Sequence, residues 1–211
     1  MLAKCKAVGD RLEEEHRPAA IASWWFYLQG LWHSGLRREE SLDLHWTDRT
    51  RLCVEDLDCD RPMIWIPGGK EKGNRDRVLP MAPEFAEFLR EVPQGRRHGY
   101  VFNPLSRRVD YCERLTAKQI GSVVSEIGEA ATVKVSESGG KVKFASCHDL
   151  RRSFGERWAS RVMPPVLQEL MRHQQFPVVA NRSECVAERQ LAIVAVRSDS
   201  TLSVDRCSLV F

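Results

Sequence analysis

Three separated segments concentrate arginine, lysine, histidine and acidic side chains, the types that bind anions and transfer protons. They are SGLRREESLDLHW at 34–46, GKEKGNRDRVLPM at 69–81, and SCHDLRRSFGERW at 146–158 continuing to LQELMRH at 167–173. A guanidinium group is planar, permanently charged and able to bind an oxyanion bidentately. Histidine and lysine can accept or donate protons in a reaction. The three segments therefore contain the groups of an anion-binding reactive site, provided that the fold brings them together.

Each of these groups also has an ordinary structural interpretation. Arg37 and Glu40 would lie one helical turn apart, where an exposed ion pair is worth about 0.3–0.5 kcal/mol. A lysine in a glycine-rich turn normally serves solubility, and His173 follows an apolar helix face where a histidine can cap or pack. Taken singly, each structural interpretation is favoured. The order of the groups along the chain decides between the two.

In combination, the segments resemble the catalytic domain of the tyrosine recombinases, the phage-integrase family. That family shows a G-L-R-x-x-E segment, a lysine on a β-hairpin before a V-P-L-like strand, an H-x-x-R helix and a later L-x-x-H. All four motifs occur here in that order, over roughly residues 20–175. The matching positions are Arg37 with Glu40, Lys72, His148 with Arg151, and His173. Lys72 fits the family's spacing to Pro80 better than Lys70, which stays an alternative.

The resemblance implies that Arg37 and Arg151 bind the two non-bridging oxygens of a DNA phosphodiester. Charge builds on these oxygens when the phosphorus is attacked, and preorganised donors for such charge contribute roughly 3–4 kcal/mol each in other enzymes. Glu40 would orient Arg37 rather than react. No metal and no cofactor is required.

The remaining matches would handle protons and phosphate contacts. Lys72 would protonate the leaving 5′ oxygen as a general acid, His148 would assist proton transfer from the nucleophile, and His173 would hydrogen-bond the phosphate. Three further basic residues are candidates for contacts with DNA phosphates, at even odds with ordinary exposure: Arg75, Arg77 and Arg152.

The residue that should attack the phosphate has no match. The family's nucleophile is a tyrosine shortly after the L-x-x-H histidine, but the position nine residues after His173 holds Arg182, and the last tyrosine is Tyr111. We also find no counterpart of the family's N-terminal DNA-clamping domain before residue 34. We therefore expect that this chain alone does not cleave DNA.

The resemblance ends between His173 and Pro177, where the composition changes as well. All six tryptophans lie before Phe176. We predict an integrase-like catalytic domain at 1–176 and a divergent, poorly ordered tail at 177–211. A frameshift or pseudogene remnant would explain the change, and specialisation as a regulator is the alternative.

Composition sets bounds on the class of protein. The net charge is only +3 with a pI of about 8.5, less basic than many nucleic-acid binders. No apolar stretch reaches membrane-spanning length, and the N-terminal residues lack the apolar core of a signal peptide. The seven cysteines form no C-x-x-C pair, which argues against a zinc site and for reduced thiols in the cytoplasm.

The apolar pattern predicts the elements that must position these groups. Trp24, Trp25, Leu28, Leu31 and Trp32 recur at helical spacing in 21–33, which predicts a deeply packed helix, and a second helix should run from Gly35 to about Trp46. Three short strands are expected within 51–80, with a hairpin loop at 67–74. Four further helices are expected around 83–89, 116–127, 150–158 and 164–171, and 134–144 should form a hairpin or an exposed loop.

The expected fold is a mostly helical α+β domain with a small three-stranded antiparallel sheet, resembling the recombinase catalytic core. The expected function is that of a site-specific integrase or recombinase homologue that binds double-stranded DNA and other recombinase protomers. A non-catalytic module that modulates an intact recombinase is the competing interpretation.

Overall fold

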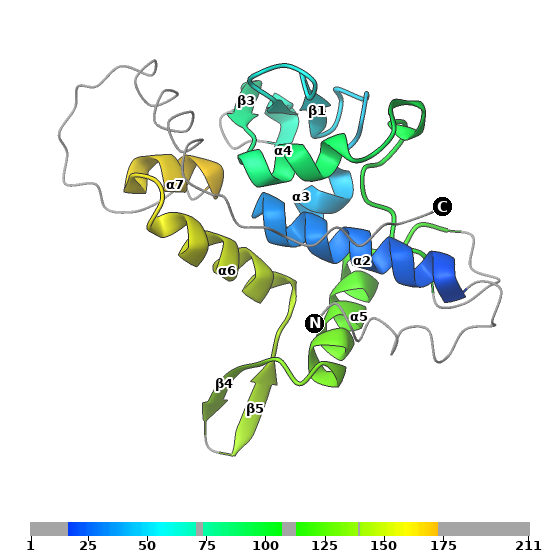
Figure 1. The fold of residues 1–211 in the computed structure, drawn as a ribbon, viewed down its shortest axis with the longest axis vertical. Helices are drawn as coiled ribbons and strands as arrows, with labels where there is room; N and C mark the ends of the chain where they lie inside the picture. The colour runs from blue at the N-terminus through cyan, green and yellow to red at the C-terminus, as the bar shows by residue number, and fades with distance from the viewer. Residues whose placement is uncertain (1–16, 71–73, 107–112, 139, 173–211) are drawn as a thin grey trace.

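The computed structural model describes residues 17–70, 74–106, 113–138 and 140–172 and has the predicted mostly helical α+β fold (Figure 1). Six helices are described: α2 Arg17–Ser34, α3 Arg38–Asp43, α4 Pro83–Arg90, α5 Ala117–Ala130, α6 Cys147–Ala159 and α7 Pro164–Leu170. Five strands accompany them: β1 Cys53–Glu55, β2 Met63–Ile66, β3 Arg77–Pro80, β4 Lys134–Ser138 and β5 Lys141–Phe144. Lys72, His173 and the predicted tail at 177–211 lie outside the described residues.

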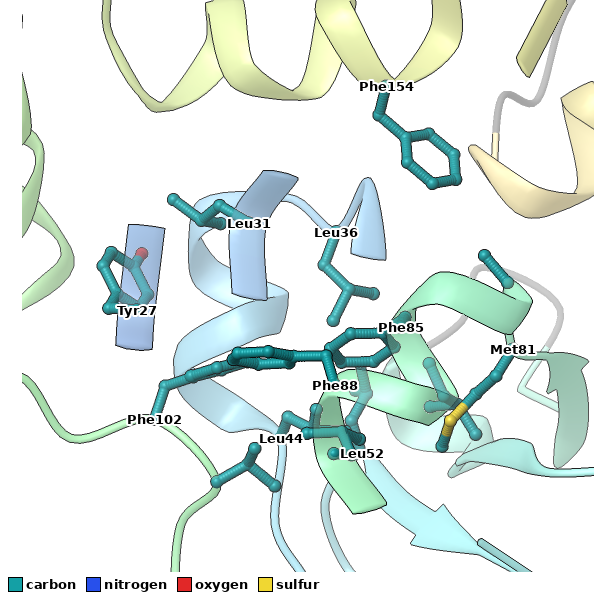
Figure 2. Packing of buried hydrophobic residues seen from close by; sticks show 14 of the residues in the cluster. Tyr27, Leu31, Leu36, Leu44, Leu52, Met81, Phe85, Phe88, Phe102 and Phe154 are labelled. Carbon is teal, nitrogen blue, oxygen red and sulfur yellow. The ribbon is translucent and has the colours of Figure 1, made fainter. Parts of the chain in front are cut away.

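Helix α2 is the centre of the apolar core and packs against α3, α4 and α6. Trp24 and Tyr27 are fully buried, and Leu31 is 1% exposed. Figure 2 shows Leu31 and Tyr27 on this helix facing the same core as Phe102 and Phe85. The prediction of deep packing is wrong for Trp32, which is 36% exposed and has the Arg157 guanidinium 4.0 Å from its ring centroid.

Helix α3 is shorter than predicted, ending at Asp43 rather than near Trp46. Leu44 adopts an extended conformation, and the backbone then joins the edge of the sheet. The His45 amide donates to the Leu52 carbonyl at 2.7 Å, and the Trp46 amide donates to the Gly99 carbonyl at 2.9 Å. These hydrogen bonds to residues outside the helix outweigh the helical pattern of the local sequence.

The predicted sheet is confirmed as three antiparallel strands in the order β1-β2-β3. Ile64 pairs with Val54 on one side and with Leu79 on the other, and all three side chains are buried. The glycine-rich connector begins with a short 3-10 helix, η2, at Gly68–Lys70. The segment 134–144 is a hairpin, β4–β5, that extends away from the helices in Figure 1.

Local sequence signals explain where the later helices begin. Pro83 and Pro164 occupy the first positions of α4 and α7, where the missing N–H costs nothing. Thr116 and Gln119 form the predicted capping box at the start of α5. Among the described residues, no helix is long and apolar enough to span a membrane.

Candidate active site

A glycine turn between α2 and α3 attaches the first motif to the H-x-x-R helix. Gly35 has a φ of +61°, and a Cβ added there would lie 2.4 Å from the ring of Phe154 on α6. Only glycine fits this backbone conformation and this close approach without strain. Leu36 is buried beside the turn, and Arg37, the next residue, is exposed at the start of α3.

Arg151 lies on the buried side of α6 and is 4% exposed. Its guanidinium donates hydrogen bonds to the backbone carbonyls of Gly35 and Met171. Burial, aided by the positive charge of Arg37, lowers the pKa of Arg151 to about 10. The group therefore stays cationic at neutral pH, and the two carbonyls fix its orientation.

Glu40 is surrounded by three guanidinium groups, which we call the Glu40 cluster: Glu40, Arg37, Arg151 and Arg172. The Glu40 carboxylate is 2.6 Å from Nη1 of Arg37, 3.1 Å from Nη1 of Arg172 and 4.0 Å from Nη1 of Arg151. It also accepts a hydrogen bond from the Arg37 amide at 2.9 Å. Glu40 thus contacts the side chain and the backbone of Arg37, as an orienting residue would.

A cavity of about 780 Å³, which we call the site cavity, opens beside this cluster between α3, α5 and α6. Its lining includes Arg37, His148 and Arg151, which come from segments far apart in sequence. Four basic side chains line it against one acidic one: Arg37, Arg38, Lys118 and Arg151 against Glu39. The cavity is therefore suited to an anion.

His148 is exposed in the first turn of α6, and its neighbour Asp149 holds that turn in place. The buried Asp149 carboxylate accepts hydrogen bonds from Ser146 Oγ at 2.6 Å and from Lys143 Nζ at 2.9 Å. Although burial opposes it, these hydrogen bonds lower the pKa of the Asp149 carboxyl. The β4–β5 hairpin and the start of α6 are thereby joined at the edge of the site cavity.

The other predicted residues are distributed differently. Lys70, the alternative to Lys72, pairs with Asp43 at 3.3 Å, at the opposite end of α3 from Arg37. Arg75 and Arg77 are exposed before and on β3, and Arg152 is exposed on α6 with Asp149 at 4.0 Å. Of the five predicted catalytic residues, the structure brings Arg37, His148 and Arg151 together around one cavity.

Sequence reasoning missed several residues of this region. Arg172 directly precedes His173 in the L-x-x-H motif, and nothing in the pattern assigns it a partner. Lys118 and Ser122 lie four residues apart on α5 and line the site cavity, so a polar face of that helix was a detectable signal. Arg38 packs on the same helix, because Gly121 has no side chain at the place that the Arg38 guanidinium occupies.

Within the described part of the chain, no group of histidine, cysteine and acidic residues could hold a metal ion.

Comparison with known proteins gives a consistent result. The model of the phage integrase family matches residues 14–182. The chain is 24% identical over 144 residues to the tyrosine recombinase XerA of Pyrococcus furiosus, covering 68% of this chain and 43% of that protein. A solved structure of XerA recombinase covers 81% of this chain and 55% of its own, with 20% identity and a TM-score of 0.47. The chain thus spans less than half of the length of the curated relative, and it belongs to the phage integrase family.

Proposed function

We propose that this chain binds double-stranded DNA through the site cavity, with a backbone phosphate between Arg37 and Arg151, as a homologue of the site-specific recombinases. The observation that carries the proposal is that Arg37, His148 and Arg151 line one basic cavity although they come from distant segments. Two guanidinium groups can bind the two non-bridging oxygens of one phosphodiester. His148 is exposed on the same cavity, where it can accept or donate a proton.

The burial and exposure of the two cavity arginines favour a role in phosphate binding over a role in an ordinary surface ion pair. Arg151 is held by two backbone carbonyls and is almost fully buried, so it needs little reorganisation to receive an anion. Arg37 is held by Glu40 and keeps 43% of its side chain exposed, so it can reach a ligand. One rigid cation and one accessible cation suit a phosphate that arrives from solvent.

The remaining assignments are proposed from motif position alone. Lys72 is the proposed general acid, and His173 is the proposed hydrogen-bond donor to the phosphate. Arg75, Arg77 and Arg152 are proposed to contact neighbouring phosphates of the backbone, since all three are exposed. Other recombinase protomers are the proposed partners, and the cytoplasm is the proposed location.

We further propose that this chain alone does not form a covalent link to DNA. Tyr27 is fully buried against Ser41, and burial raises the pKa of its hydroxyl, so it cannot act as a nucleophile in the site cavity. The ring of Tyr100 is covered by the Arg114 guanidinium, 3.4 Å from its centroid. Tyr111 lies outside the described residues and matches no nucleophile-bearing motif. A DNA-binding module that modulates an intact recombinase needs no nucleophile of its own and is the second candidate function.

A nicked suicide DNA substrate, which traps covalent intermediates, tests both parts of the proposal. Incubation followed by denaturing electrophoresis should give no protein–DNA band, while native binding measured by anisotropy should be weak and should fall steeply with salt. Replacing Arg37 and Arg151 with alanine should weaken that binding further. A covalent band from this chain alone would disprove the claim of inactivity, and mapping the linked residue would identify the nucleophile.

A grafted tail separates a missing nucleophile from wider damage. In this variant, the segment after His173 is replaced by the corresponding segment of an active tyrosine recombinase. Recovered cleavage is the expected result, because the phosphate-binding and proton-transfer groups are proposed to be intact. Continued absence of cleavage, in a variant that folds and binds DNA, would contradict the proposed roles of the site residues.

A further inference from the structure

Arg172 is an unusual residue at the end of α7. It follows the helix with a φ of +50°, in the left-handed region where helices commonly place glycine. Its side chain is only 9% exposed and reaches Glu40, with 3.1 Å between Nη1 and Oε1. Its carbonyl accepts a hydrogen bond from Nη2 of Arg37 at 2.9 Å. An arginine held in a strained backbone conformation indicates that its side chain contributes something that glycine cannot.

The charge balance of the Glu40 cluster indicates what that contribution is. The side chains of Arg151 and Arg172 are 5% and 9% exposed, and both lie within 4.0 Å of the Glu40 carboxylate, whose side chain is 12% exposed. Cationic groups at this depth are normally paired with carboxylates, because an uncompensated buried charge is costly. Among the described residues, the cluster thus brings three guanidinium groups to the Glu40 carboxylate beside an open, basic cavity. An anion in that cavity would add a negative charge close to Arg37 and Arg151.

We propose that Arg172 is a positioning residue of this anion site, whose guanidinium offsets the charge of Glu40 so that Arg37 and Arg151 keep theirs for a phosphate in the site cavity. The proposal rests on the proposed function and adds a residue to it. Without Arg172, Glu40 would neutralise one of the two phosphate-binding groups. The Arg172 carbonyl also fixes the orientation of Arg37, so one residue sets both the charge and the geometry of the site.

A double-mutant cycle in the full chain tests this mechanism, with a labelled double-stranded DNA fragment as the probe. R172Q should weaken DNA binding on the order of tenfold at low salt, the size expected for one unit charge near a partly desolvated site. Removing the Glu40 charge as well, in E40Q/R172Q, should restore affinity to within about threefold of the parent chain. R172K keeps the charge and should bind like the parent.

A glycine variant keeps the result independent of folding. R172G suits the positive φ and should leave the thermal midpoint unchanged or higher, yet it should lose affinity as R172Q does. Full affinity in both R172Q and R172G, with R37A still impaired, would overturn the role of Arg172 while the proposed function stands. A double variant as weak as R172Q would also overturn it, because a purely structural role gives no compensation.

A second probe separates the two proposals if the parent chain fails to bind DNA. That failure would remove the proposed function, but the cluster itself should still bind inorganic phosphate and raise the thermal midpoint. Loss of this rise in R172Q and its return in E40Q/R172Q would support the inference. No rise in the parent chain would overturn it.

Discussion

Two glutamates in this molecule each face three basic side chains, with opposite consequences. Glu40 faces Arg37, Arg151 and Arg172. Glu84 on α4 faces His33, Arg157 and Arg161, and we call these four residues the Glu84 cluster. The Glu84 cluster joins α2, α4 and α6 at the surface. The two clusters are alike in composition, so their differences isolate what makes a group of arginines a site.

Burial is the first difference. Arg157 and Arg161 are 23% and 45% exposed, so water shares in their solvation, while Arg151 is 5% exposed. The second difference is the use of the carboxylate. Glu84 accepts hydrogen bonds at 2.9 Å and 2.6 Å from its two arginines, whereas Arg151 bonds to backbone carbonyls and is 4.0 Å from Glu40.

We propose that the Glu40 cluster, unlike the Glu84 cluster, binds an anion because Arg151 and Arg172 are buried and because Arg151 is oriented by neutral carbonyls beside a cavity. The carboxylate of Glu84 is outnumbered too, but its partners are more exposed, so solvent screens the charges and the pairs contribute little beyond joining the helices. In the Glu40 cluster the carboxylate is outnumbered where solvation is poor. The following predictions test this contrast, from the largest expected effect to the smallest.

Arg151→Ala should destabilise the fold by about 3–4 kcal/mol, because it leaves two buried carbonyls without donors and removes a buried charge partner. Urea unfolding monitored by tryptophan fluorescence measures the change. The matched control, Arg161→Ala in the Glu84 cluster, should cost less than about 1 kcal/mol. Equal costs in the two variants would show that burial does not distinguish the clusters.

Gly35→Ala should destabilise the chain by about 2–3 kcal/mol and weaken DNA binding as well. The added methyl group would clash with the Phe154 ring, and alanine would be strained at this positive φ. The clash should push the first motif away from α6. Gly95→Ala is the control, since a Cβ there meets no atom within 4 Å, and it should change stability by less than about 0.5 kcal/mol. Thermal unfolding and anisotropy measure the two effects.

The Glu84 cluster should make stability depend on pH in the acid range. The nearby His33 side chain and hydrogen bonds from Arg161 and Arg157 lower the pKa of Glu84 from 4.5 to about 2. Because the folded pKa is lowered, this contribution is complete above pH 4.5 and is lost as the pH falls toward 2. It should amount to about 1 kcal/mol after solvent screening.

Unfolding free energies measured across that pH range check the prediction. Glu84→Gln should flatten the curve between those limits, whereas Glu156→Gln, at an exposed carboxyl on α6, should follow the parent curve. A Glu84→Gln curve that parallels the parent would place the acid sensitivity elsewhere.

Arg152→Ala should have the smallest effect. Its side chain is 58% exposed, so stability should change by less than about 0.5 kcal/mol. If it contacts a DNA phosphate, the slope of log affinity against log salt should fall by about 1. Arg75→Ala and Arg77→Ala extend the test to β3, and unchanged slopes in all three would remove these residues from the DNA surface.

The sequence predicted elements whose formation is local. The three strands were expected from an alternating pattern, a short apolar run and the segment before Pro80, and α5 begins at the capping box of Thr116 and Gln119 as expected. The predicted end of α3 was wrong, since backbone hydrogen bonds to Leu52 and Gly99, both outside the helix, hold His45 and Trp46 in an extended segment. Tertiary contacts of this kind leave no trace in local periodicity.

The candidate site was predictable for a different reason. The motif order named Arg37, Glu40, His148 and Arg151 before any geometry was known, and these four lie around the cavity or in its cluster. Arg172 was not predictable, because its importance depends on a carboxylate that only the fold brings within 3.1 Å. Spacing identifies residues that share a motif, but it does not identify the charges that balance them.

The carbonyl contacts of the site arginines also determine when the site can form during synthesis of the chain. Arg151 and its partner Gly35 are separated by 116 residues, and Arg37 and the Arg172 carbonyl by 135. A chain emerging from the ribosome at about 5–20 residues per second exposes Arg37 many seconds before its last partner is synthesised. During that interval Arg37 has Glu40 as a neighbour, but Arg151 and the Arg172 carbonyl are not yet present. The site arginines therefore reach their oriented arrangement only late in synthesis, after residues 171 and 172 have been added.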